Sequence, residues 1–173
     1  GLDWLGDSEF SRLVVLGPDL YNGAPGISLF LAALAKATGE AQYAELALGG
    51  VSTLRSHLRS ANAPRFARAL GVGGATGLGS VVYGLTELAS LLNESALLDD
   101  ASRAVRLMGD ELIDGDRRLD LIGGSAGGIL GLLKLYRRTG ENDVLLKAVR
   151  MGDHLLAQPR VARGMGKSCV GLG

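Results

Sequence analysis

A glycine-rich stretch followed by a run of helix-forming apolar residues recurs three times along the chain. It reads DLYNGAPGISLFLAALAKATGE from Asp19 to Glu40 and DLIGGSAGGILGLLKLYRRTGE from Asp120 to Glu141. Between them, from Leu70, lies LGVGGATGLGSVVYGLTELASLLNE, so the period is about fifty residues. Repeats of this length are typical of solenoids and rings built from one stacked supersecondary unit.

Each repeat predicts a pair of helices. From Ile27 to Ala35 the apolar residues recur three and four positions apart, and Gly39 predicts a left-handed cap that ends this helix. Its partner is expected from about Gln42 to Leu58. The other expected helices are Val81 to Leu92, Ala96 to Ile113, Ile129 to Arg138 (with a stop at Gly140), and Val144 to Leu156. The prediction is an all-α fold of three helical hairpins, with Arg12 to Leu16 as the one short run that could be extended.

The two helices of each hairpin differ in polarity. The first is apolar around most of its circumference and rich in Gly, Ala and Ser, whereas the second carries charges such as Arg55, Arg59, Arg103 and Lys147 on one side. A helix that is apolar all round is buried, and one with a polar face meets water. We therefore expect an inner layer of first helices and an outer layer of second helices, arranged as a solenoid or an arc of a ring.

The glycine-rich loops precede the first helices, so all three are expected on the same rim. Their glycines share one spacing within the repeat, in the pairs Gly23 and Gly26, Gly74 and Gly77, and Gly124 and Gly127. Small residues at these places allow tight turns and a close approach of neighbouring helices. A rim of loops on a rigid scaffold is also a common place for a functional site.

Composition narrows the class of protein. The 173 residues suggest one domain, and 18 basic against 18 acidic residues give a formal charge of zero, which argues against nucleic acid as a partner. The single cysteine, Cys169, fits a reducing compartment. The longest apolar run, Ile27 to Ala35, is shorter than the roughly 20 residues of a membrane span, and GLDWLGDSEF lacks a signal-peptide pattern. The expectation is a soluble, cytoplasmic chain.

The three motifs, in this order, resemble those of the cyclase domain of class II (LanM-type) lanthipeptide synthetases, which belong to the lanthionine synthetase C-like family. LDWLG, near the start of the chain, is similar to the segment that precedes them there. The resemblance covers the chain up to about Ala157, whereas QPRVARGMGKSCVGLG does not look like the family's continuation. We therefore expect a partial LanC-like cyclase domain over 1–157 and an atypical glycine-rich tail over 158–173.

The resemblance implies a fold, a reaction and a cofactor. The fold would be an α/α toroid of about six or seven helical hairpins, with the active site at the glycine-rich rim. The reaction would add a cysteine thiol of a lanthipeptide precursor peptide to a dehydroalanine or dehydrobutyrine, which forms a thioether ring. A zinc ion held by two cysteines and a histidine would bind the thiol as the more nucleophilic thiolate. A further histidine and an aspartate would handle protons.

One of these groups has a counterpart in this chain. The family's aspartate begins a motif that matches DLIGGSAG, so the resemblance makes Asp120 the candidate catalytic residue. Asp19 holds the same place in the first repeat, where the resemblance implies no role. Without the resemblance, Asp120 could simply be a loop carboxylate that accepts hydrogen bonds from turn amides.

The other groups have no match. The family's histidine motif and its Trp-Cys and Cys-His-Gly zinc motifs do not occur, and Cys169 precedes Val170 rather than a histidine. His57 and His154 lie on second helices, where solvated or packing roles are expected. The chain therefore reads as the N-terminal half of a cyclase domain, inactive alone, whose uncovered inner surface favours self-association.

Two other functions stay open. A helical-repeat module could bind a peptide without catalysis, and another α/α toroid enzyme could act on sugars, although 5% aromatic residues are few for stacking sugar rings.

Two glycine-rich segments do not have the glycine spacing of a nucleotide-binding motif. GMGKS lacks the first glycine of a phosphate-binding loop at Val161, and Thr76 breaks the dinucleotide-binding pattern in GVGGATGLG.

Overall fold

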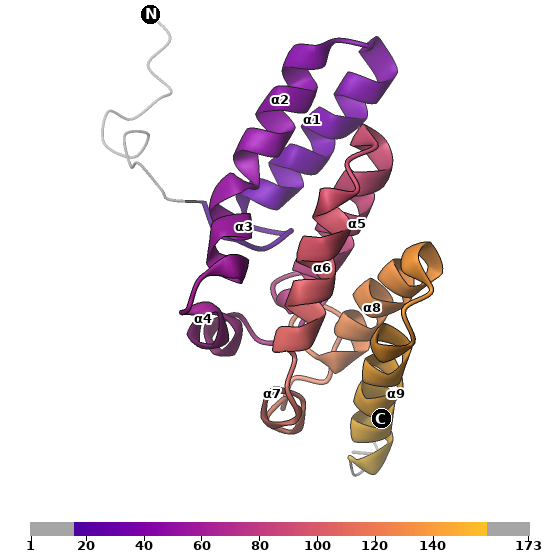
Figure 1. The fold of residues 1–173 in the computed structure, drawn as a ribbon. Helices are drawn as coiled ribbons and strands as arrows, with labels where there is room; N and C mark the ends of the chain where they lie inside the picture. Colours follow the sequence, from indigo (N-terminus) through magenta and orange to yellow (C-terminus); the bar gives the residue numbers. More distant parts are fainter. Residues whose placement is uncertain (1–15, 159–173) are drawn as a thin grey trace, which may run out of the picture.

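The computed structural model describes residues 16–158, and these residues form nine helices. Apart from one isolated bridge between Gly17 and Gly23, no β-structure occurs in that range, which confirms the predicted all-α fold. Figure 1 shows the helices in order. They are α1 (Ala24–Thr38), α2 (Ala41–Gly50), α3 (Ser52–Arg59), α4 (Ala63–Leu70), α5 (Leu78–Leu92), α6 (Ala96–Leu107), α7 (Asp110–Asp114), α8 (Ser125–Thr139) and α9 (Asn142–Ala157).

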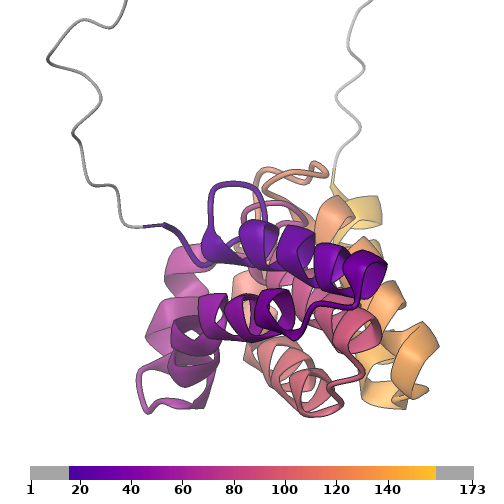
Figure 2. The same ribbon diagram turned by 90° about the horizontal axis from the view of Figure 1, so that it is seen from above.

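The helices form the two expected layers. α5 packs between α1 and α8, and this row is the inner layer. In the outer layer, α2 packs on α1, α6 on α5 and α9 on α8, so each hairpin joins one inner helix to one outer helix. Figure 2 shows the hairpins from above, with α1 alongside α2. The predicted arrangement of three hairpins in sequence is confirmed.

The inner helices are not equally buried, although each of them is apolar around most of its circumference. Leu78, Leu85 and Leu88 of α5 are almost completely buried, whereas on α1 Ile27 is 50% and Phe30 66% exposed. α5 has an inner neighbour on both sides, but α1 and α8 each have one among the described residues. Burial of an apolar helix therefore depends here on its position in the row as well as on its sequence.

Two predicted long helices are broken, and one helix was not predicted. The helix expected over Gln42–Leu58 is interrupted at Val51, just after Gly50 comes close to the Ser28 side chain of α1. The helix expected over Ala96–Ile113 ends at Leu107, because Gly109 has an extended backbone and starts α7 instead. The unexpected helix, α4, begins with Ala63 and Pro64, which is a favourable place for proline.

The two helix stops predicted at glycines are confirmed. Gly39 and Gly140 adopt left-handed backbone conformations, with φ of 77° and 70°, where a side chain would be strained. Of the possible extended run Arg12–Leu16, only Leu16 is described, and the tail from residue 159 lies outside the described residues. Among the helices of residues 16–158, none has both the length and the apolar character that a membrane span requires.

Glycines bring the backbones of α5 and α8 into direct contact. A Cβ atom on Gly79 would lie 2.6 Å from Cα of Gly128, and one on Gly74 would lie 2.6 Å from Cα of Gly127. Both distances are well below van der Waals contact, and the obstructing atoms are backbone atoms that cannot rotate away. The close approach expected from the small residues is therefore present between these two repeats.

We predict that Gly79→Ala is less stable than Gly152→Ala by about 1–3 kcal/mol, the usual effect of overpacking. Both substitutions replace a helical glycine and gain similar helix propensity. A Cβ on Gly152 meets no atom within 4 Å, so that variant is the matched control. Urea unfolding at neutral pH measures the difference, and equal stabilities would show that α5 and α8 can separate without cost.

Candidate functional site

The three glycine-rich loops lie together at one end of the inner helices, as predicted. The N–H of Tyr21 in the first loop donates to the carbonyl of Ala75 in the second, at 3.2 Å. The N–H groups of Ala75 and Thr76 in turn donate to the carbonyl of Ile122 in the third loop, at 2.9 and 3.2 Å. Figure 2 shows the loops before α1 and α8 on the same side of the molecule. Backbone hydrogen bonds thus join the three repeats into one continuous rim.

The structure corrects the predicted alignment of the glycines. The residues that precede the inner helices are Gly23, Gly77 and Gly124, and their φ values of −124°, −120° and −120° are nearly identical. Gly77, not Gly74, is therefore the counterpart of Gly23 and Gly124. Counting back four residues from each places Gly73 where the other repeats have Asp19 and Asp120. The extra glycines of the middle loop made both alignments possible in sequence.

Asp120 lies on the rim with one carboxylate oxygen engaged in the loop. Its Oδ1 accepts hydrogen bonds from the backbone N–H groups of Ile122 and Gly123, at 2.9 and 2.7 Å. Oδ2 has no hydrogen-bond partner within residues 16–158, and the residue is exposed. Asp120 therefore has the loop-shaping role that an ordinary turn aspartate has, and in addition a second oxygen that can meet a ligand.

Asp19, at the same place in the first repeat, has a different environment. Its Oδ1 accepts a hydrogen bond from the N–H of Asn22 at 2.7 Å, but only 9% of the residue is exposed. The repeat thus produces a similar turn twice and leaves only the Asp120 carboxylate open to solvent.

Asp116 holds the Asp120 loop from within the protein and was not identified from sequence. Its Oδ2 accepts hydrogen bonds from both the N–H and the hydroxyl of Ser125, each at 2.6 Å. Its Oδ1 accepts from the N–H of Arg118 at 3.0 Å and lies 3.5 Å from that of Leu119. Leu119 has a φ of 61°, which is unusual for a large side chain, and it directly precedes Asp120. Asp116 therefore fixes both the strained turn and the start of α8.

These contacts lower the pKa of Asp116 below the usual aspartate value of about 3.9. Burial alone would raise this pKa, but it is outweighed by the hydrogen bonds from Ser125 and from the Arg118 and Leu119 amides, which favour the carboxylate. Because the pKa is lower in the folded state than in the unfolded state, the carboxylate stabilises the fold above about pH 4. That stabilisation is lost as the pH falls through the folded-state pKa.

Asp116→Asn should accordingly weaken the dependence of the unfolding free energy on pH below about pH 4. The variant should also be less stable than the wild type at neutral pH, because an amide cannot accept all of these hydrogen bonds. Urea unfolding across the acid range measures both effects, with the exposed Asp143→Asn as the control. If the unfolding free energy of Asp116→Asn fell as steeply below about pH 4 as that of the wild type, the lowered pKa of Asp116 would be contradicted.

Both described histidines have packing roles. His154 on α9 is 6% exposed, and its Nε2 lies 3.1 Å from the backbone carbonyl of Asp116, to which it donates. This contact anchors α9 to the loop that carries Asp120. His57 on α3 packs against Phe66 of α4, with ring centroids 5.2 Å apart. The two rings lie on different helices and make separate contacts.

The described residues do not fit the zinc ion that the family resemblance implies. Across residues 16–158, no three His, Cys, Asp or Glu side chains lie close enough together to hold a metal ion. The two histidines are engaged in the separate contacts just described, and Cys169 lies outside the described residues.

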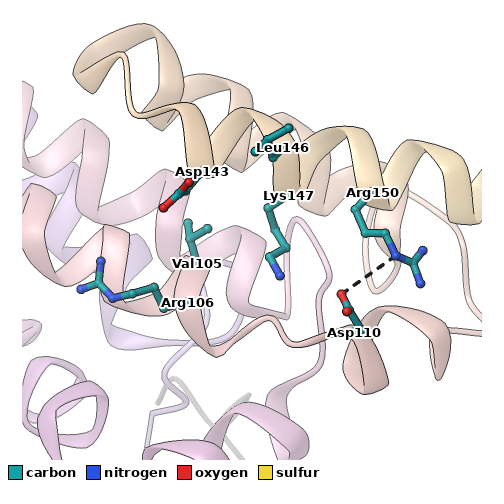
Figure 3. A pocket seen from close by; sticks show the side chains of 7 residues that line it. All are labelled: Val105, Arg106, Asp110, Asp143, Leu146, Lys147 and Arg150. Carbon is teal, nitrogen blue, oxygen red and sulfur yellow. Dashed lines mark ion pairs between the residues drawn. The ribbon is translucent and has the colours of Figure 1, made fainter.

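Two surface cavities differ in their relation to the rim. Figure 3 shows a cavity of about 390 Å³ lined by α6, α7 and α9, where Nε of Arg150 and Oδ1 of Asp110 lie 3.9 Å apart. α6 and α9 belong to the outer layer, and α7 lies in the connection between α6 and α8. This cavity is therefore not part of the rim. A second cavity, of about 430 Å³, is lined by residues that include Asp116, Arg118 and Gly123, and so adjoins the Asp120 loop.

Comparison with known protein families gives a match over most of the chain. The family model described as "Lanthionine synthetase C-like protein" matches residues 14–169, which is most of the 173-residue chain. A search of curated proteins finds no match. The helical hairpins are consistent with the α/α toroid fold of that family. The chain therefore belongs to the lanthionine synthetase C-like protein family.

Proposed function

We propose that this chain is part of a lanthionine synthetase cyclase of the LanM type, acting in the cytoplasm on a lanthipeptide precursor. The reaction adds a cysteine thiol of the peptide to a dehydroalanine or dehydrobutyrine and closes a (methyl)lanthionine ring. Family membership supports the reaction class. The observation that carries the proposal is Asp120, whose Oδ2 is open on the rim while its Oδ1 holds the loop.

In this proposal Asp120 handles a proton. Sulfur forms a bond to Cβ of the dehydro residue, and the electron pair of the double bond moves towards Cα and the adjacent carbonyl as an enolate. The thiol loses a proton and Cα gains one, so no atom is lost and the peptide mass does not change. Oδ2 of Asp120 accepts or returns such a proton, while the two N–H groups bound to Oδ1 keep the carboxylate in place.

Ring formation by the intact protein tests the proposal. The substrate is a synthetic peptide that already contains one dehydroalanine and one cysteine, so dehydration plays no part. Ring closure removes the thiol without a change of mass, and a thiol-alkylating agent followed by mass spectrometry counts the peptides that remain open. We expect closure well above the uncatalysed rate, whereas the 173-residue chain alone should not close rings. Peptide binding by the intact protein without any thiol loss would favour a non-catalytic binding module instead.

We also predict that the isolated chain self-associates through its inner layer. Leu130 on α8, like Ile27 and Phe30 on α1, is at least half exposed, and exposed large apolar side chains can promote association where they gather into a patch. Leu130→Lys should shift light-scattering masses towards the monomer. Leu146→Lys on the outer helix α9 is the matched control, because Leu146 is 59% exposed and Leu130 is 58%. A monomeric wild-type chain, or equal effects of the two variants, would contradict this interface.

A further inference from the structure

Three arginines line the cavity that adjoins the Asp120 loop. Arg68 comes from α4, and Arg117 and Arg118 come from the loop before α8. All three are exposed, and none of them forms an ion pair with any residue between 16 and 158. Arginines from two separate elements thus line one cavity of about 430 Å³, and none of the three is held in an ion pair among the described residues.

The acidic residues of this cavity do not balance the arginines. Glu111 and Asp116 also line it, but the Asp116 carboxylate is already bound by Ser125 and by loop amides. Three arginines and two carboxylates therefore line the cavity, and one of the two carboxylates, that of Asp116, is already hydrogen-bonded within the loop. The planar fork of an arginine suits a carboxylate, which it can bind through two parallel hydrogen bonds. The cavity is accordingly suited to an anionic ligand.

The cavity and Asp120 share one loop. Gly123 lines the cavity, and its N–H donates to Oδ1 of Asp120 at 2.7 Å. The side chain of Arg118 lies directly against Gly123, since a Cβ built on that glycine would be 2.6 Å from Cδ of Arg118. A ligand held by these arginines would consequently lie beside the Asp120 carboxylate.

We propose that this cavity binds carboxylate side chains of the peptide substrate. An acidic residue near the reacting segment docks on Arg68, Arg117 and Arg118, while the reacting residues lie at Asp120. Because it names a substrate feature for the same rim, this inference rests on the proposed function. The arginines are binding residues in this account, and Asp120 alone handles the proton.

Fluorescence anisotropy with the 173-residue chain tests the binding. The probes are two labelled peptides of identical sequence, except that every glutamate in the first is a glutamine in the second. The wild type should bind the glutamate peptide more tightly, and Arg117→Gln/Arg118→Gln should weaken that binding by about tenfold or more, as expected for lost charged hydrogen bonds. The control is Arg137→Gln/Arg138→Gln, which changes the charge equally in the last turn of α8. Its effect should stay within about twofold, since exposed charges beyond the Debye length are largely screened.

Two further measurements separate this inference from the proposed function. Arg68→Gln changes a different element, so it tests the cavity even if the loop variant does not fold. In ring closure by the intact protein, the arginine variants should raise KM for the glutamate peptide and leave kcat unchanged, whereas Asp120→Asn should lower kcat without weakening probe binding. If no ring closure occurs, the proposed function fails and the anisotropy result still stands. Equal affinity for the two probes, or equal weakening by the two double variants, would overturn the carboxylate site.

Discussion

Asp100→Ala is expected to lower the free energy of unfolding by about 3 kcal/mol. Asp100 is completely buried on α6, and its carboxylate accepts hydrogen bonds from two arginines of α3. Nε of Arg55 donates at 2.7 Å, and Nε and Nη2 of Arg59 donate at 2.7 and 2.8 Å. These contacts join two outer helices of different repeats, so their loss should destabilise the whole packed unit.

The expected effect lies at the low end of the roughly 3–5 kcal/mol found when one partner of a buried ion pair is removed. The side chains of Arg55 and Arg59 are 23% and 49% exposed, so they can regain water once the carboxylate is gone. The control is Asp99→Ala at the neighbouring, exposed position, which should change stability by no more than about 0.5 kcal/mol. Urea unfolding that shows the same loss for both variants would mean that the ion cluster does not stabilise the fold.

This cluster illustrates what helical periodicity cannot reveal. The pattern placed Arg55 and Arg59 on a polar face and therefore in water. In the structure that face meets Asp100, which is 45 residues beyond Arg55 and belongs to another repeat. A hydrophobic period identifies the polar side of a helix, but only the packing of the repeats shows what lies against it.

The same limit applies to details of the fold. The alternation of apolar and amphipathic helices correctly predicted the hairpins and the two layers, because both features are local. The break at Val51 follows Gly50, which lies close to Ser28 of α1, and Phe30 is exposed on a helix that has one inner neighbour among the described residues. Both features involve a second helix, which the residue pattern of a single helix does not show.

In the candidate site, too, some residues could be identified from sequence and others could not. Asp120 could be identified from sequence because it opens a motif that resembles a family motif. Asp116, Arg117 and Arg118 belong to GDRRLD, which reads as an ordinary polar loop. Their roles arise from the chain reversal at Leu119, which brings Asp116 to Ser125, and from α4, which brings Arg68 to the same cavity. No pattern in the sequence predicts that these residues come close together.

Asp120→Asn is expected to slow ring closure by roughly 10²- to 10⁴-fold, the usual contribution of a general acid or base. Asparagine is nearly isosteric with aspartate, and its carbonyl oxygen can still accept the N–H groups of Ile122 and Gly123. The loop should therefore keep its shape, while the ability to carry a proton is lost. A residue that only shapes the loop would tolerate the same change far better.

Asp19→Asn is the matched control, because Asp19 has the same place in the repeat and a similar turn hydrogen bond. Since its carboxylate is almost buried, it should have no part in proton transfer, and ring closure should stay close to the wild-type rate. Helical circular dichroism and urea unfolding of both variants show whether either change disturbs the fold.

The central claim, that Asp120 handles a proton on the rim, is tested most directly by the rate of thiol loss. The intact wild-type protein, Asp120→Asn and Asp19→Asn are each given a peptide that already contains dehydroalanine and cysteine, and open peptides are counted by alkylation. We expect a loss of at least about 100-fold in Asp120→Asn and a near-normal rate in Asp19→Asn. A normal rate in Asp120→Asn, or an equal loss in both variants, would contradict it.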